Sequence, residues 1–140
     1  MLSDTERKKL IEEADRARAN AYCPYSGFSV GAALLTDEGK IYRGCNIENA
    51  AYPAGICAER TAFSTAVCCG EKNFKAIAIA GGPKGKTVTE AYPCGMCRQF
   101  MNELTDSSLF EVIIVKDEGS YISHTLDELL PYSFGPEALK

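Results

Sequence analysis

The chain has 140 residues, of which 46% are hydrophobic and 24% charged, so it is long enough for one domain with its own apolar core. The formal net charge of −4 argues against a protein that follows nucleic-acid phosphates, because such proteins usually carry a basic patch. No run reaches the roughly 18–20 apolar residues that span a bilayer, and the first residues lack the apolar core of a secretory signal. We therefore expect no contact with membranes and a cytoplasmic location.

Taken in order, the chain predicts four helices and five strands. The expected helices cover residues 4–21, 57–69 and 94–104, with a short fourth helix after Thr125. The expected strands cover residues 28–35, 41–45, 74–80, 111–116 and 120–124. Ser3 and Glu6 have the spacing of a capping box at the first helix, and Gly39 suits the left-handed position of a tight turn.

The last two strands are joined only by residues 117–119. A parallel crossover needs about a dozen residues, so these strands must form an antiparallel hairpin. The order of elements predicts an α/β fold, a three-layer α/β/α sandwich around a five-stranded mixed sheet. We expect residues 1–140 to form a single domain.

Three cysteines occupy positions that suit a metal ion. Cys94 and Cys97 lie three residues apart at one predicted helix start, and Cys57 lies at another. Helix N-termini favour thiolates, and three thiolates can hold zinc while a fourth position stays open for water. Glu59, two residues from Cys57, could move protons at that water.

A structural zinc site closed by a fourth cysteine is the alternative. Cys68 and Cys69 lie roughly 16–18 Å along the helix from Cys57, too far to share its metal. Cys23 and Cys45 stay possible. Cys45, Cys68 and Cys69 are otherwise expected to behave as small apolar residues.

Three thiolates outweigh the charge of Zn²⁺, so a nearby cation is expected to compensate. Arg60 and Arg98 each lie one position beyond a cysteine motif. We favour Arg60.

The chain resembles the small, homotetrameric type of cytidine deaminase along nearly its whole length. The residues that carry this resemblance are Cys23-Pro24-Tyr25-Ser26, Phe28 to Leu34, Gly44 to Ala50, Cys57-Ala58-Glu59-Arg60-Thr61, Pro93 to Gln99, and Glu128 to Pro136. A lone Cys-x-x-Cys would be weak evidence, but these motifs together and in order are highly specific. Met96 departs from the family, which often has alanine at that position.

The resemblance implies zinc-dependent hydrolytic deamination of cytidine and 2′-deoxycytidine to uridine and 2′-deoxyuridine, with release of ammonia, in pyrimidine salvage. It implies one zinc per chain, bound by Cys57, Cys94 and Cys97, and makes Glu59 the proton shuttle. The implied substrate-binding residues are Phe28 against the base, Asn46 and Glu48 at the ribose hydroxyls, and the backbone around Ala58 at the pyrimidine edge. It further implies a homotetramer whose active sites share Asn49, Ala50, Tyr52 and Phe134 between subunits.

Two other functions stay open at this point. One is a deaminase of the same fold that acts on another aminopyrimidine, such as a nucleoside antibiotic or a cytosine in nucleic acid. The acidic net charge argues against the polynucleotide, and the carboxylate of Glu48 favours a nucleoside over a nucleotide, because like charges repel. The other is a zinc-stabilised scaffold without turnover.

Overall fold

A computed structural model describes residues 2–140 of the chain. Its first helix, α1, covers Asp4–Ala17 and begins with the predicted capping box, in which Ser3 and Glu6 exchange hydrogen bonds. The α-helix ends earlier than predicted, since Arg18–Asn20 form a 3₁₀ turn. No helix within residues 2–140 combines the length and the apolar character that crossing a membrane requires.

Five strands form one mixed sheet, as predicted. They are β1 (Phe28–Thr36), β2 (Ile41–Cys45), β3 (Phe74–Pro83), β4 (Glu111–Val115) and β5 (Tyr121–Thr125). The strand order is β2-β1-β3-β4-β5, with β3 and β4 parallel and the other pairs antiparallel. The predicted hairpin of β4 and β5 is confirmed, and a 3₁₀ turn at Asp117–Gly119 closes it.

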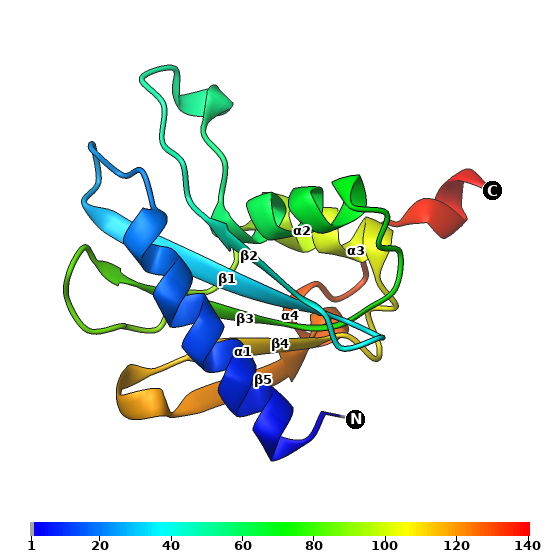
Figure 1. The fold of residues 1–140 in the computed structure, drawn as a ribbon. Coiled ribbons are helices and arrows are strands. Elements are labelled where there is room, and N and C mark those ends of the chain that lie inside the picture. The colour runs from blue at the N-terminus through cyan, green and yellow to red at the C-terminus, as the bar shows by residue number, and fades with distance from the viewer. Residues whose placement is uncertain (1) are drawn as a thin grey trace.

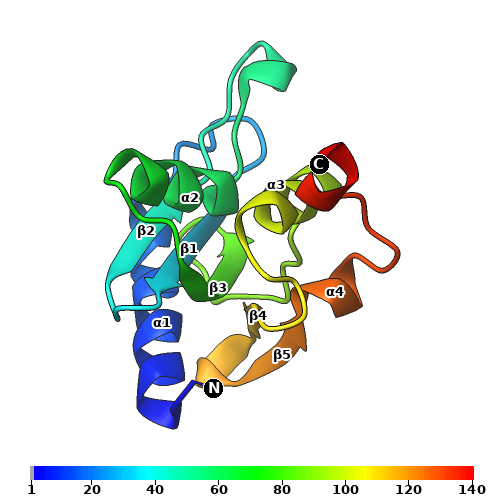
Figure 2. The ribbon, with the colours of Figure 1, turned by 90° about the vertical axis from the view of Figure 1, so that its right-hand side faces the viewer.

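Helices cover both faces of this sheet and make the predicted three layers. Helix α1 crosses one face, whereas α2 (Ala58–Cys68) and α3 (Gly95–Leu104) lie beside each other on the opposite face (Figures 1 and 2). The short α4 (Leu126–Leu129) follows β5.

The alternation of side chains along β1 serves both layers. Ala32 and Leu34 pack in the core under α2 and α3, whereas Ala33 and Leu35 pack in the core under α1. Strand β1 is therefore buried on both faces, as its nearly continuous apolar sequence predicted.

Strand β3 is three residues longer than predicted. Gly81, Gly82 and Pro83 suggested a loop, but they extend the ladder with β1, where Pro83 pairs with Phe28. The backbone is crowded there, since a Cβ on Gly82 would lie 2.6 Å from the carbonyl oxygen of Thr87. This pairing holds the start of β1, at Phe28, beside the end of β3.

The prediction that Cys68 and Cys69 behave as small apolar residues is wrong for this chain. Both are exposed at the end of α2, and Cys45 is half-buried. Ala66 in the same turn is fully buried in the core, so Cys68 and Cys69 lie on the side of the helix end that faces away from that core.

Candidate metal centre and active site

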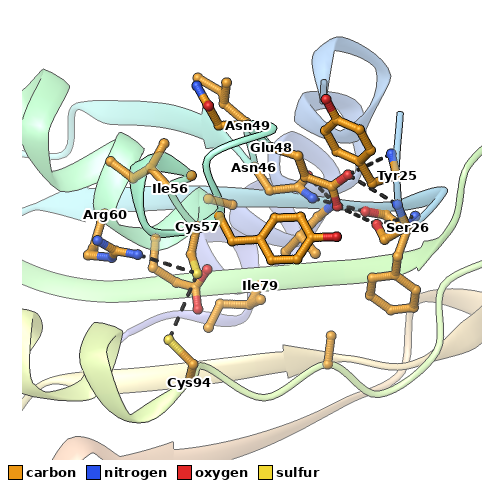
Figure 3. Close-up of a pocket in the computed structure, with 18 of the residues that line it drawn as sticks. Tyr25, Ser26, Asn46, Glu48, Asn49, Ile56, Cys57, Arg60, Ile79 and Cys94 are labelled. Carbon is orange, nitrogen blue, oxygen red and sulfur yellow. Dashed lines mark hydrogen bonds between the residues drawn. The ribbon is translucent and has the colours of Figure 1, made fainter. Parts of the chain in front are cut away.

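Two helix N-termini bring three thiols to one point. Cys57 is the N-cap of α2, Cys94 is the N-cap of α3, and Cys97 lies buried in the first turn of α3. Their sulfur atoms all lie within 4.8 Å of one another, and the Sγ atoms of Cys57 and Cys94 are 3.8 Å apart (Figure 3).

This spacing fits zinc. A Zn–S distance of about 2.3 Å in tetrahedral geometry places two sulfur ligands about 3.8 Å apart. Within residues 2–140, the group contains no fourth cysteine, so the structure does not bring Cys23 or Cys45 to the cluster. Three protein ligands leave the fourth position open for water or substrate, which is typical of catalytic zinc sites.

The pKa values of Cys57 and Cys97 are shifted in opposite directions. A hydrogen bond from Cys97, together with others from Arg60 and Cys94, lowers the pKa of Cys57 to about 5. Donating that hydrogen bond, together with burial, raises the pKa of Cys97. The lowered pKa of Cys57 favours the thiolate, which is the form of the side chain that binds a metal cation.

The structure places the two candidate cations differently. Nη2 of Arg60 lies 3.8 Å from Sγ of Cys57, whereas Arg98 donates to the carbonyl oxygens of Pro93 and Leu129, at 2.8 and 2.7 Å. Arg60 is therefore the arginine that faces the thiols, and Arg98 connects the segment before α3 to α4.

Glu59 lies in the first turn of α2 with only 4% of its surface exposed. Burial raises the pKa of its carboxyl to about 7. The side chain lines the same cavity as Cys57 and Cys94. A buried carboxyl beside an open metal position can exchange protons with whatever binds there.

The cavity has a volume of about 800 Å³, large enough for a small organic molecule. Its walls come from β1, from the loop that follows β2, from the start of α2, from β3 and from the segment before α3. The predicted site residues that line it are Phe28, Asn46, Glu48, Asn49, Tyr52, Cys57, Ala58, Glu59, Arg60 and Cys94.

Two of these residues already have protein partners. Oδ1 of Asn46 accepts from the backbone N–H of Val30, and its Nδ2 donates to the carbonyl oxygen of Phe28, both at 2.9 Å. The carboxylate of Glu48 accepts from Tyr25 and Ser26. Both side chains are held in place before any ligand binds.

The structure does not bring every predicted residue to the cavity. Ala50 is exposed on the loop after β2, and Phe134 is 60% exposed near the C-terminus. The carbonyl oxygen of Phe134 accepts from Gln99 and Asn102 of α3, and Phe134 does not line the cavity of its own chain.

Some lining residues were given no role from the sequence. They include Tyr25, Ser26, Ile56 and Tyr92. Tyr25 and Ser26 lie within a motif that was recognised, but their contacts with a loop twenty residues away could not be seen from spacing.

A mixed α/β sheet with three thiols and a buried glutamate at two helix N-termini defines a zinc-dependent deaminase. The family model for the "cytidine and deoxycytidylate deaminase zinc-binding region" matches residues 4–114. The chain belongs to this family.

Known proteins of similar length agree with this assignment. A cytidine deaminase of Sporosarcina psychrophila is 46% identical over 132 residues, which cover 94% of this chain and 93% of that protein. A cytidine deaminase of Halalkalibacterium halodurans is 44% identical over 132 residues, which cover 94% of this chain and 96% of that protein. The crystal structure of a cytidine deaminase from Burkholderia pseudomallei matches with a TM-score of 0.82 and 43% identity, covering 95% of this chain and all of that one.

Proposed function

We propose that this protein catalyses the zinc-dependent hydrolytic deamination of cytidine and 2′-deoxycytidine, releasing ammonia and the corresponding uridine nucleoside, in pyrimidine salvage. The observation that carries the proposal is a buried carboxyl group, Glu59, in one cavity with two thiols of a three-thiol cluster that leaves a metal position open. Full-length relatives that bear the name cytidine deaminase support it.

Cys57, Cys94 and Cys97 would hold the metal. Zinc bound there would supply a Lewis acid that lowers the pKa of water toward neutrality. The thiolates and Arg60 together set the charge of the centre, because the guanidinium faces Cys57.

Glu59 would move the protons of the reaction. Its carboxylate takes a proton from the attacking water and passes it to N3 of the pyrimidine, while the water oxygen bonds to C4. The carboxylate then takes the remaining hydroxyl proton and gives it to the amino group, the C4–N bond breaks, and ammonia leaves. The atoms balance, since water and cytidine become uridine and ammonia.

The other cavity residues would orient the nucleoside. Phe28 offers an aromatic face to the base, and the backbone N–H of Ala58 is free of helix partners at the first position of α2. Asn46 and Glu48 lie where polar groups can meet the sugar hydroxyls. A neutral nucleoside suits this wall better than a nucleotide, because Glu48 would repel a phosphate.

We further propose that residues 1–140 act as a single domain in a homotetramer whose subunits complete one another's sites with Asn49, Ala50, Tyr52 and Phe134. The loop after β2 projects from the body of the chain (Figure 1), and Tyr52 on it is 79% exposed. A cytoplasmic location is proposed as well, since all seven cysteines are free, which suits a reducing compartment.

The decisive experiment measures the loss of cytidine absorbance on adding purified protein, with zinc content assayed on the same sample. We expect turnover with about one zinc per chain, and Glu59→Gln should keep zinc but lose activity by several orders of magnitude. Turnover that survives in Glu59→Gln would refute the role of this residue. Bound zinc without turnover of cytidine or 2′-deoxycytidine would favour another aminopyrimidine substrate, and failure on a panel of these would favour a scaffold.

Light scattering tests the assembly. A tetramer would have four times the 15.2 kDa mass of the chain. A stable, fully active monomer would contradict active sites shared between subunits.

A further inference from the structure

Two loops meet at the mouth of the cavity. One connects the 3₁₀ turn after α1 to β1, and the other follows β2. The backbone N–H of Tyr22 donates to the carbonyl oxygen of Asn46 at 3.0 Å, and the N–H of Glu48 donates to the carbonyl oxygen of Tyr22 at 2.8 Å. These bonds fix the distance between the loops and bring the side chain of Glu48 over residues 25 and 26.

The carboxylate of Glu48 is almost fully occupied by these residues (Figure 3). Its Oε1 accepts from the backbone N–H groups of Tyr25 and Ser26, at 3.0 and 3.1 Å, and its Oε2 accepts from Oγ of Ser26. A carboxylate offers about four acceptor positions, so one position on Oε2 stays free for a ligand. The direction in which this free acceptor position points depends on the Ser26 hydroxyl, which donates to the same oxygen.

The hydroxyl of Ser26 has a second contact. Its Oγ accepts from the backbone N–H of Phe28 at 3.0 Å, while its proton goes to Glu48. One hydroxyl therefore links the carboxylate at the sugar end of the cavity to the aromatic residue at the base end. The bond from Ser26 is also the main reason that the pKa of Glu48 lies below its ordinary value, so this carboxyl stays ionised.

We propose that Ser26 is a positioning residue that orients Glu48 toward one hydroxyl of the nucleoside sugar. This inference rests on the proposed role of Glu48 in binding that sugar. Ser26 is exposed and lies outside the two apolar cores, so removing its hydroxyl leaves their packing intact. Its loss should weaken substrate binding through the sugar and leave the chemistry at the base unchanged.

The test compares cytidine with 2′,3′-dideoxycytidine, which lacks the hydroxyls that Glu48 would bind. Ser26→Ala is expected to raise KM for cytidine about tenfold, to change kcat less than threefold, and to leave KM for the dideoxynucleoside within twofold. Ser26→Thr keeps the hydroxyl and should restore most of the lost affinity. The matched control is Ser108→Ala, because Ser108 is also exposed and donates to a carboxylate, Asp106, at 2.7 Å. Ser108→Ala should change neither substrate's KM.

A double-mutant cycle separates the inference from the function on which it rests. If Ser26 acts through Glu48, adding Ser26→Ala to Glu48→Gln should cause no further loss. An unchanged KM for cytidine in Ser26→Ala, while Glu48→Gln raises it, would overturn the inference and leave the role of Glu48 intact. An equal rise for both nucleosides in Ser26→Ala would also overturn it, because the effect would then pass through the base. If Glu48→Gln does not distinguish the two nucleosides, the proposed role of Glu48 fails first and that of Ser26 with it.

Discussion

Gly44 permits the close contact between strand β2 and the helix that carries Cys57 and Glu59. A Cβ at this position would lie 2.4 Å from the carbonyl oxygen of Ala58 and 2.4 Å from the backbone nitrogen of Ala62. Both atoms belong to the backbone of α2, so no side chain can rotate away. The substitution Gly44→Ala should therefore push β2 and the first turns of α2 apart.

The size of the effect follows from the distances. Ordinary van der Waals contact begins near 3.4 Å, so the new methyl group requires a displacement of about 1 Å. Overpacking of this kind typically costs about 1–3 kcal/mol of unfolding free energy. A shift of about 1 Å in a group that positions the reaction can lower the rate by about 100-fold. We expect both effects in Gly44→Ala, because Glu59 moves with the first turn of α2.

Urea denaturation, thermal melting and initial rates on cytidine, all measured on the zinc-loaded protein, test this prediction. A loss of about 3 kcal/mol should lower the melting temperature by roughly 6–12 °C for a chain of this size. Gly95→Ala is the control for folding, since no atom lies within 4 Å of its Cβ position, and it should leave stability unchanged or raise it by up to about 1 kcal/mol. Wild-type stability and rate in Gly44→Ala would refute the backbone contact between β2 and α2.

Three further predictions concern charge, the Arg18 network and the metal. Burial raises the pKa of Glu111, but hydrogen bonds from Arg7 and from Ser123 on β5 outweigh this effect and hold the pKa below the usual 4.5. The stability that ionised Glu111 contributes is present above pH 4.5 and is lost as pH falls through the lower folded pKa. In urea titrations Glu111→Gln should therefore destabilise the protein by about 1–3 kcal/mol at pH 7, and by progressively less as pH falls below 4.5. Arg18 is buried and donates five hydrogen bonds that connect α1, β1 and the turn after β3. Arg18→Met should therefore lower the unfolding free energy by roughly 2–4 kcal/mol. A change below about 0.5 kcal/mol, which is typical of an ordinary surface substitution, would contradict this prediction. Dialysis against a chelator should abolish turnover and lower the melting temperature, and added zinc should restore both up to about one ion per chain; activity that persists without bound metal would exclude a catalytic zinc.

Local signals in the sequence predicted most of the fold. The capping box at Ser3 and Glu6 and the short connection at residues 117–119 act within a few residues, so each could be recognised without tertiary information. The end of β3 could not be recognised in this way. Gly81 and Gly82 favour a loop by local preference, and only the pairing of β3 with β1, a contact between segments fifty residues apart, makes them extended.

The site shows the same limit. The spacing of Cys94 and Cys97 and the two helix starts predicted a three-thiol cluster, because helix geometry fixes where neighbouring side chains point. The sequence favoured Arg60 over Arg98 as the compensating cation, and the structure agrees, because the guanidinium of Arg60 faces Cys57 whereas that of Arg98 donates to carbonyl oxygens. Spacing alone could not show where each guanidinium finds its acceptors. It also could not show that Ser26 holds Glu48, since this contact depends on how two loops are connected in space.

The C-terminal segment links the metal helix to the proposed assembly. Two amide donors on α3, from Gln99 and Asn102, hold the carbonyl oxygen of Phe134 at 2.8 and 3.0 Å. The same contacts leave the phenyl ring 60% exposed, although burying it would contribute about 1.5–3 kcal/mol. The proposed homotetramer would bury this ring against a neighbouring subunit. Because α3 carries Cys97 as well as Gln99 and Asn102, the proposed subunit contact would lie against the same helix that supplies a metal ligand.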